Sequence, residues 1–237
     1  MSLRLIGLNA SDIIECRVVG RINRFTVSVE AGGSRINVHI NNTGKLPGVL
    51  VYGNKGLCLP TSSGRLGYRL FAIECCGGFA LIDTRLQERS VLHAIMNNLV
   101  PWLKPCRPIA QMPRYKDCIL DFLLECTGEN VLVETKSAVL RDPQGYALYP
   151  DTPSRRGRRH VECLRHATKN GYRSVLVFVA AFPNARGFKP NMVVDGRFGE
   201  LLRTAMREGV DVRGIGLHYN PDSTSVEMYD PDLKVVV

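Results

Sequence analysis

The sequence has no long hydrophobic segment. Its longest apolar run extends from Val175 to Phe182, whereas a helix that crosses a bilayer needs about 18 apolar residues. The first residues also lack a sustained apolar stretch followed by a cleavage site, so no export signal is expected. These absences argue against a membrane partner and favour a cytoplasmic protein.

Residue types that often carry specialised functions are scarce or unsuitably spaced. The eight cysteines form no C-x-x-C pair and have no flanking histidine at zinc-finger spacing, which argues against a zinc site. Because the cysteines lie in apolar, strand-like stretches, buried thiols are expected, with disulfides as the alternative for a hyperthermophilic source. The single tryptophan, Trp102, also argues against a surface rich in base-stacking side chains.

Acidic side chains are outnumbered by basic ones. The chain has 31 Lys and Arg against 22 Asp and Glu, a net charge of +9, and this balance favours a polyanionic partner, nucleic acid first. Residues 1–80 hold nine basic and four acidic side chains, a balance of +5, whereas the remainder mixes both signs. Because 45% of residues are hydrophobic and 22% charged, the 237-residue chain is expected to fold into one or two domains.

The first third of the chain has the pattern of a small β-barrel. β-branched residues alternate or cluster in short stretches separated by Gly, Pro and Ser, and residues 31–34 are typical of a tight hairpin turn. This density of strands favours an oligonucleotide/oligosaccharide-binding (OB) barrel, with a sandwich fragment as the alternative. Strands are expected at residues 13–19, 24–30, 34–40, 49–52, 56–59 and 68–74.

From residue 81 the pattern changes to that of a mixed α/β domain. A helical rhythm stops at Pro101, two β-rich stretches flank a turn at residues 126–129, and a later strand–helix–strand sequence predicts a right-handed crossover. The boundary is placed near residue 80, which gives a barrel over residues 1–80 and an α/β domain over 81–237. Helices are expected at 85–99, 158–169 and around 198–206, and strands at 118–125, 130–139, 174–182 and 210–218.

Asp121, Glu134 and Lys136 form the most specific candidate catalytic group. Glu134 and Lys136 are two apart on an expected strand and so share a face, and a hairpin partner can bring Asp121 beside them. Carboxylates suit Mg²⁺ or Mn²⁺, and a lysine can stabilise phosphate charge, as in metal-dependent phosphodiester cleavage of the D…(D/E)-x-K type. The alternative is a solvated cross-strand ion pair.

An arginine-rich segment precedes the second expected helix. Cations are disfavoured at a helix N-terminus, so their presence there is explained if a phosphate binds to them and to the free N–H groups. The alternative is a basic, solvated loop, and a lone histidine in such a segment is more often a packed or surface residue. The candidate nucleic-acid contacts here are Arg155, Arg156, Arg158, Arg159 and His160.

A second set of candidate nucleic-acid contacts lies in the expected barrel. Arg21 and Arg24 stand at a strand entry, and Asn42 and Thr43 belong to an Asn-Thr-Gly turn. Such groups can bind phosphates on a barrel face. They can equally be structural, because a turn favours the same residues.

These segments together resemble the sugar fermentation stimulation protein A (SfsA) family over nearly the whole chain. Several ordered motifs with suitable spacing carry the resemblance, which no single motif would do. They are Arg21-x-x-Arg24-Phe25, Asn42-Thr43-Gly44, Leu120-Asp121-Phe122, Val133-Glu134-Thr135-Lys136-Ser137, Tyr149-Pro150-Asp151 with Arg156-Gly157 and His160, Phe188-x-Pro190-Asn191, and Asp195.

The resemblance implies an OB barrel followed by a nuclease-like domain of the PD-(D/E)xK superfamily. It implies DNA as partner, Asp121 and Glu134 as ligands of Mg²⁺ or Mn²⁺, and Lys136 as a third catalytic residue. An acid usual in the first helix of the family is expected to be replaced by His93, and one before the hairpin by Ala110, which leaves a one-metal or weakened site. The leading hypothesis is a metal-dependent deoxyribonuclease; the alternative is a non-enzymatic, DNA-binding regulator of sugar-utilisation genes. A homodimer is a further expectation.

Overall fold

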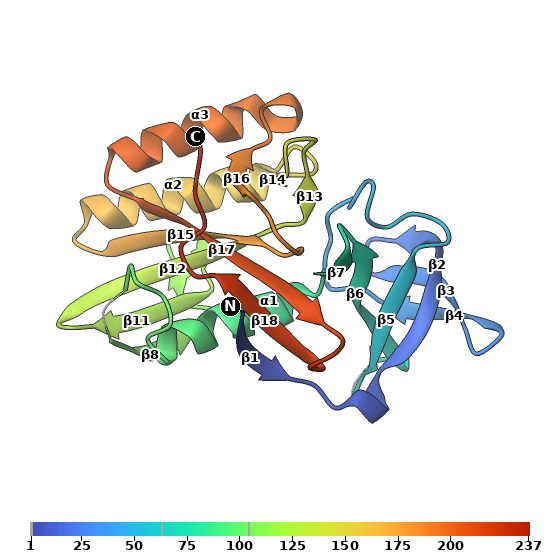
Figure 1. The fold of residues 1–237 in the computed structure, drawn as a ribbon. Helices are drawn as coiled ribbons and strands as arrows, with labels where there is room; N and C mark the ends of the chain where they lie inside the picture. The colour runs from blue at the N-terminus through green and yellow to red at the C-terminus, as the bar shows by residue number, and fades with distance from the viewer. Residues whose placement is uncertain (1, 63, 104) are drawn as a thin grey trace.

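The computed structural model describes residues 2–62, 64–103 and 105–237 and places a barrel beside a larger layered unit (Figure 1). The barrel strands follow the spatial order β4-β3-β2-β5-β6, and a parallel contact between His39 of β4 and Arg69 of β6 closes the ring. The expected OB-type barrel is thus confirmed. Its strands are β2 (Ile14–Asn23), β3 (Thr26–Ala31), β4 (Ser34–His39), β5 (Lys55–Pro60) and β6 (Tyr68–Cys75).

Two predictions made from local sequence in the barrel can be compared with the structure: a hairpin turn and a short strand. The hairpin between β3 and β4 has Gly32 and Gly33 with φ of 56° and 77°, the left-handed values that a two-residue turn requires. The expected strand at residues 49–52 is wrong: these residues form turns, with backbone bonds from Val49 and Leu50 to Leu46. β-branched residues alone therefore do not make a strand without a neighbour to pair with.

The larger unit is a mixed sheet with helices on both faces (Figure 1). Its strands follow the order β8-β11-β12-β15-β17, with β12, β15 and β17 parallel, and β18 pairs with β17. α2 packs on β12 and β15 with α3 behind it, whereas α1 packs against β7, β8 and β12. The elements are β7 (Gly78–Leu81), α1 (Thr84–Met96), β8 (Cys106–Gln111), β9 (Arg114–Tyr115), β10 (Cys118–Ile119), β11 (Phe122–Cys126), β12 (Glu129–Ala138), β13 (Leu140–Arg141), β14 (Tyr146–Tyr149), α2 (Arg155–Lys169), β15 (Arg173–Ala180), β16 (Gly187–Pro190), α3 (Met192–Arg207), β17 (Asp211–Asn220) and β18 (Ser225–Asp230).

The N-terminal strand departs from the expected division of the chain. β1 (Leu3–Gly7) pairs antiparallel with β18, so it extends the sheet of the larger unit, and a short 3₁₀ turn at Ala10–Asp12 leads from it to the barrel. The barrel therefore begins after β1 rather than at residue 1. Covering an exposed sheet edge in this way satisfies the backbone groups of β18.

The core is continuous through both units. β15 is buried along almost its whole length, from Ser174 to Ala180, because helices and neighbouring strands cover both its faces, as its apolar sequence indicates.

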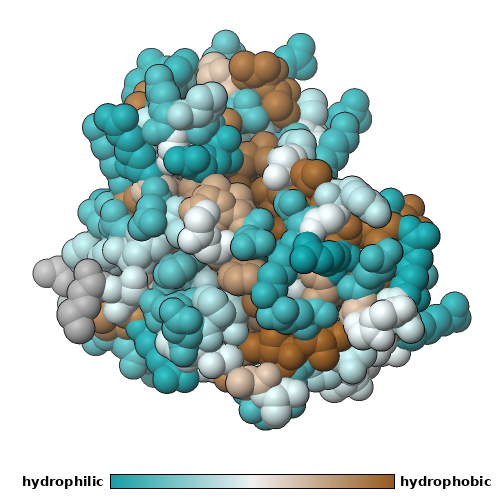
Figure 2. Space-filling model, turned by 45° about the vertical axis from the view of Figure 1, so that its right-hand side comes forward, coloured by the Kyte–Doolittle hydropathy of each residue, from teal (hydrophilic) through white to brown (hydrophobic). Residues whose placement is uncertain are grey.

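The face in Figure 2 is mostly hydrophilic, with hydrophobic residues in separate patches. Among the described helices, none is both long and apolar enough to span a membrane.

Four cysteines form disulfides, so the expectation of thiols is correct for only part of the set. Cys106 on β8 is bonded to Cys126 on β11, and Cys118 on β10 is bonded to Cys163 on α2. The remaining cysteines, at positions 16, 58, 75 and 76, are free. Disulfides form because distant stretches meet in the fold, which cysteine spacing alone does not reveal.

Candidate active site

A cleft of about 660 Å³ lies where the barrel meets the larger unit. The barrel contributes Arg24, Phe25 and a loop at residues 41–46, whose backbone N–H at Leu46 donates to Asp151 Oδ2 at 2.9 Å. The larger unit contributes the first turns of α1, residues 134–137 of β12 and the segment that enters α2. The cleft therefore brings together residues from distant parts of the sequence.

The predicted hairpin is confirmed and places the candidate acids side by side. Strands β11 and β12 pair with Phe122 opposite Val133, and the backbone N–H of Asp121 donates to the carbonyl of Val133 at 3.2 Å. The register thus carries Asp121 to the position facing Glu134. Asp121, Glu134 and Lys136 all line the cleft.

Asp121 is held by the strand opposite it. Its Oδ2 accepts hydrogen bonds from the backbone N–H and the hydroxyl of Thr135, each at 2.6 Å. These bonds fix the carboxylate and leave Oδ1 outside them. Burial and the charge of Glu134 raise the pKa of Asp121, against the opposing effects of Lys136 and Thr135. A cation at this position would offset the same repulsion.

Glu134 is almost fully buried, with 3% of its side chain exposed. Its Oε1 pairs with the Lys136 ammonium and with His160 Nδ1, the latter at 2.5 Å. Burial alone would raise the pKa of Glu134, but Lys136 and His160 outweigh it, so the pKa is lowered and the group stays ionised. Its Oε2 is also buried and has no hydrogen-bond partner among the described residues.

His160 is a buried partner of Glu134, which corrects its predicted contact with nucleic acid. Only 2% of its side chain is exposed. Arg156 Nε donates to His160 Nε2 at 3.3 Å, so the ring proton lies on Nδ1 and is donated to Glu134. The helical position of His160 on α2 turns it toward the sheet, where no nucleic acid can reach it.

Glu88 of α1 is a cleft residue that the sequence analysis missed. It lines the cleft with Thr84 and Gln87. Burial, together with the charges of Asp121, Glu134 and Asp83, raises the pKa of Glu88 to about 7, with Lys136 acting in the opposite direction. The signal was present: Asp83 caps the helix, so positions 84, 87 and 88 share one face.

His93, expected in place of a helix acid, is instead exposed near the end of α1. The helix therefore does supply an acid to the cleft. This acid is Glu88, which lies about one and a half turns closer to the N-terminus of α1 than His93. Ala110 lies on β8 opposite Leu123 of β11, away from the cleft-lining residues. The expected loss of acids is thus only partial.

The arginines of the arginine-rich segment lie in two different environments: some line the cleft, and others pair with acids. Arg155 and Arg156 line the cleft, above a helix start capped by Ser154, whose hydroxyl accepts from the Gly157 N–H at 2.9 Å. Arg158 instead pairs with buried Asp195, and Arg159 lies 3.8 Å from Asp117. Successive residues of a helix point in different directions, so the whole segment cannot face one ligand.

The barrel candidates divide in the same way. Arg21 donates to the carbonyls of Arg24 and Asn42, each at 3.2 Å, and burial lowers its pKa. Asn42 is buried, and its Oδ1 accepts from the Gly44 N–H at 3.0 Å. These bonds within the protein favour the structural alternative for Arg21 and Asn42, and Asn42 also lines the cleft.

Arg24 and Thr43 remain exposed at the cleft. The Arg24 guanidinium lies 5.4 Å from the centre of the Phe25 ring, which is itself 49% exposed. A cation over an exposed aromatic ring offers both a charge for a phosphate and a surface for a base.

The cleft acids fit a hard divalent cation. Glu134 Oε2 has no partner within the described chain, Asp121 Oδ1 stands outside the bonds that hold its carboxylate, and Glu88 adds a third carboxyl. Mg²⁺ and Mn²⁺ prefer such oxygen donors and need only one or two carboxylates, since water completes their coordination.

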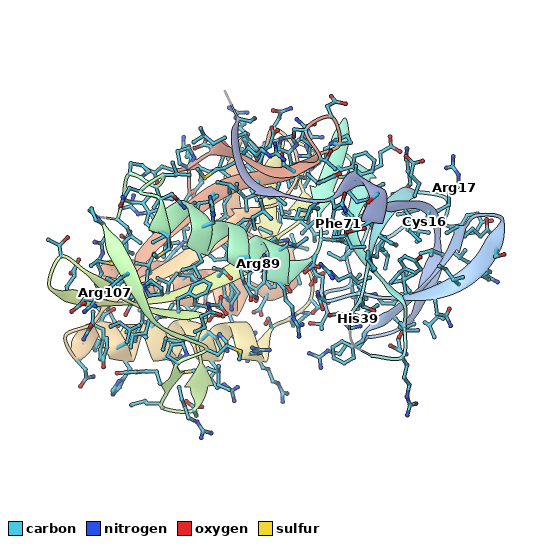
Figure 3. All side chains as sticks on the ribbon, turned by 90° about the horizontal axis from the view of Figure 1, so that it is seen from below. Cys16, Arg17, His39, Phe71, Arg89 and Arg107 are labelled. Atoms are coloured by element: carbon cyan, nitrogen blue, oxygen red, sulfur yellow. A yellow bond between two sulfur atoms is a disulfide. The ribbon has the colours of Figure 1, made fainter. Side chains whose placement is uncertain are left out.

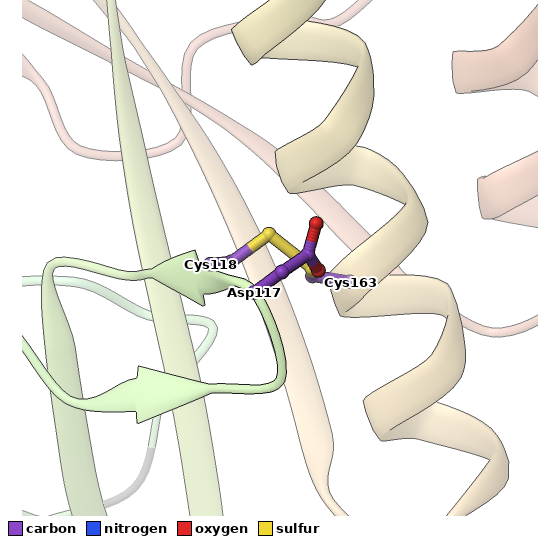
Figure 4. Close-up of side chains that lie close together, drawn as sticks. All are labelled: Asp117, Cys118 and Cys163. Carbon is purple, nitrogen blue, oxygen red and sulfur yellow. A yellow bond between two sulfur atoms is a disulfide. The ribbon is translucent and has the colours of Figure 1, made fainter.

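Among the described side chains, the one tight cluster of three metal-ligating types lies elsewhere. It consists of Asp117, Cys118 and Cys163, whose donor atoms are within 4.8 Å of one another. Figure 4 shows that the two sulfur atoms are bonded to each other. A disulfide has no thiolate to offer, so this cluster is a covalent link between β10 and α2 rather than a metal site.

Comparisons with known proteins agree with this architecture. Models of the sugar fermentation stimulation protein RE domain and of the SfsA N-terminal OB domain match residues 85–223 and 19–82. Sugar fermentation stimulation protein homologs from Pyrococcus furiosus and Archaeoglobus fulgidus are 40% and 41% identical, over 89% and 94% of this chain and 91% and 96% of theirs. A solved structure of Pyrococcus furiosus SfsA in complex with Ca²⁺ superimposes with a TM-score of 0.94 at 37% identity, covering 99% of this chain and 100% of that one. The chain therefore belongs to the sugar fermentation stimulation protein family.

Proposed function

We propose that the protein is a Mg²⁺- or Mn²⁺-dependent nuclease that cleaves DNA in the cleft between its two units. The observation that carries the proposal is the buried Oε2 of Glu134, which lies beside Asp121 and has no partner in the part of the chain that the structure describes, in a cleft that also presents arginines. A buried carboxylate oxygen without a partner is costly unless a cation binds it. The Ca²⁺ named for the Pyrococcus furiosus relative is consistent with a divalent-cation site.

Asp121 and Glu134 would hold the cation, with Glu88 as a further ligand. When bound, Mg²⁺ or Mn²⁺ would lower the pKa of a coordinated water and neutralise charge on the scissile phosphate. The protein's own contribution is to keep these carboxylates in place, through Thr135 for Asp121 and through His160 for Glu134. His160 thus acts as a positioning residue that leaves Oε2 free for the cation.

Lys136 and the arginines of α2 would act on the phosphate itself. Pairing with Glu134 outweighs burial and raises the pKa of Lys136, so its ammonium stays charged beside the acids. Its charge would count most where negative charge builds up on the phosphate during cleavage. Arg155 and Arg156 would place that phosphate at the start of α2, where backbone N–H groups also favour an anion.

The barrel would hold the DNA next to the cleft. Arg24, Thr43 and Phe25 lie on its cleft-facing surface, and the net charge of +9 favours a polyanion. Cytoplasmic location and a homodimer stay predictions.

Incubation with labelled single- and double-stranded oligonucleotides tests the proposal. Cleavage is expected with Mg²⁺ or Mn²⁺ and not with EDTA, whereas binding measured by fluorescence anisotropy should persist in EDTA and weaken steeply with salt. Binding without cleavage under every divalent cation would instead favour the non-enzymatic DNA-binding regulator.

The pH dependence of cation binding provides a separate test of Glu88. Its carboxyl is mostly protonated below about pH 7 and ionised above it, and a cation prefers the ionised form, so affinity for Mn²⁺ should rise as pH increases through about 7. Calorimetric titrations at about pH 6 and 8 should show a several-fold gain for the native protein and a smaller one for Glu88→Gln, in which Asp121 still contributes. An equal pH dependence in both proteins would place Glu88 outside the cation site.

A further inference from the structure

A second cleft, of about 560 Å³, lies on the other side of the first turns of α1. Its walls come from α1 and from barrel segments near residues 39–41, 61–62 and 64–69. Three arginines, Arg65, Arg85 and Arg89, line it together with His39, and a fourth, Arg69, lines it while paired with Asp83. Arg89 and His39 are labelled in Figure 3, the first on α1 and the second on the barrel.

The three arginines have no acidic partner in the described part of the chain, since none of them takes part in an ion pair. Asp83, the one acid among the described residues that line this cleft, is already engaged by Arg69 at 2.9 Å and by Asn41 Nδ2 at 2.9 Å. Asp83 also caps α1 through the backbone N–H groups of residues 85 and 86. The exposed guanidinium groups therefore face the cleft as uncompensated positive charge.

This arrangement is unfavourable for the protein alone. Arg85 and Arg89 are four residues apart on one face of α1, where like charges repel, and they lie in the first half of the helix, where cations oppose the helix dipole. Bound phosphate groups would reverse both effects, because guanidinium groups bind phosphate oxygens through paired hydrogen bonds.

The two clefts are neighbours. Thr84, Gln87 and Glu88 of α1 face the candidate active site, whereas Arg85 and Arg89 face the arginine cleft. Asn41 of the barrel lines both clefts, and its bond to Asp83 forms the wall between them. Near that wall the Phe25 and His39 rings stack at a centroid distance of 6.4 Å, one lining each cleft.

We propose that the arginine cleft binds backbone phosphates of the nucleic acid that flank the one being cleaved. The strand would cross the first turns of α1, with the scissile phosphate at Asp121 and Glu134 and neighbouring phosphates at Arg65, Arg85 and Arg89. This inference rests on the proposed function, because it assigns the second cleft to the same substrate. In this proposal, the acidic face of α1 and its basic face contact the same nucleic acid.

The test compares Arg85→Gln/Arg89→Gln with a matched control, Arg203→Gln/Arg207→Gln. Arg203 and Arg207 are also exposed and four residues apart, but on α3, which packs behind α2 on the far face of the sheet (Figure 1). Binding of a fluorescein-labelled oligonucleotide is followed by anisotropy in EDTA across a salt series. The α1 variant should bind roughly tenfold or more weakly at moderate salt, with the slope of log affinity against log salt reduced by about 1.4–1.8.

The control variant should match the native protein, and thermal melts should show that both variants fold. Equal affinity and slope for the α1 variant and the control would overturn this inference while leaving the proposed function intact. If the native protein binds no oligonucleotide at all, the proposed function itself fails, and the inference fails with it.

Discussion

Replacing Asp121 by Asn, or Glu134 by Gln, is expected to abolish divalent-dependent cleavage of DNA while leaving DNA affinity unchanged or slightly higher. Each amide keeps the size of the side chain but removes the charge that would hold the cation, and loss of metal-ion catalysis amounts to several kcal/mol, or more than about 100-fold in rate. Affinity should not fall, because removing a carboxylate lessens the repulsion of phosphates. Single-turnover cleavage and anisotropy of the same labelled oligonucleotide measure the two effects separately.

Glu125→Gln is the matched control, because Glu125 is on β11 of the same hairpin but pairs with Arg107 away from the cleft. It should cleave at the native rate. Cleavage by Asp121→Asn or Glu134→Gln that equals this control would remove the altered residue from the mechanism. A fall in rate with an equal fall in affinity would make the acids structural instead.

Removal of the Cys118–Cys163 disulfide should produce a large loss of stability, although the bond lies outside the cleft. The bond joins residues 45 apart in sequence, and closing a loop of that size in the unfolded chain contributes about 3–4 kcal/mol. For a protein of this size the melting temperature of Cys118→Ser/Cys163→Ser should fall by on the order of 10 °C. Scanning calorimetry under non-reducing conditions provides the measurement.

Cys75→Ser/Cys76→Ser controls for the loss of two sulfur atoms, since these cysteines are free thiols. Its melting temperature should stay close to the native value. A Cys118→Ser/Cys163→Ser variant that melts with the control would show that the bond does not contribute to stability. Such a result would also show that the disulfide is not what holds β10 against α2 beside His160.

Local sequence patterns were sufficient to predict the parts of the fold held together by short-range contacts. The hairpin of β11 and β12 and the apolar strand β15 follow from turn chemistry and periodicity, and the hairpin register then brings Asp121 to Glu134. The density of short strands also predicted the barrel, and only the nuclease-like character of the second domain came from the family resemblance. These are the features that neighbouring residues along the chain specify.

What the sequence did not reveal depends on distant contacts. Nothing near Leu3 shows that it pairs with Met228, and no spacing links Cys118 to Cys163. The direction of each arginine was also hidden, because Arg156 and Arg158 differ only by a partial turn of helix yet meet different partners. Glu88 was recognisable only once the helix cap at Asp83 was used to set the helix face.

The position of β1 makes the barrel an insertion within the larger unit. Leu3 lies opposite Met228 of β18. The sheet edge is therefore completed by two strands near opposite ends of the described chain, and the barrel sequence lies between them. During synthesis from the N-terminus the barrel can form early, while β1 has to wait for nearly the whole chain before its partner exists. Cutting the chain near residue 80 would separate β1 from β18 and leave an open sheet edge that is prone to pairing with other molecules. The larger unit therefore depends on a strand that precedes the barrel to complete its sheet, although each unit has its own characteristic architecture.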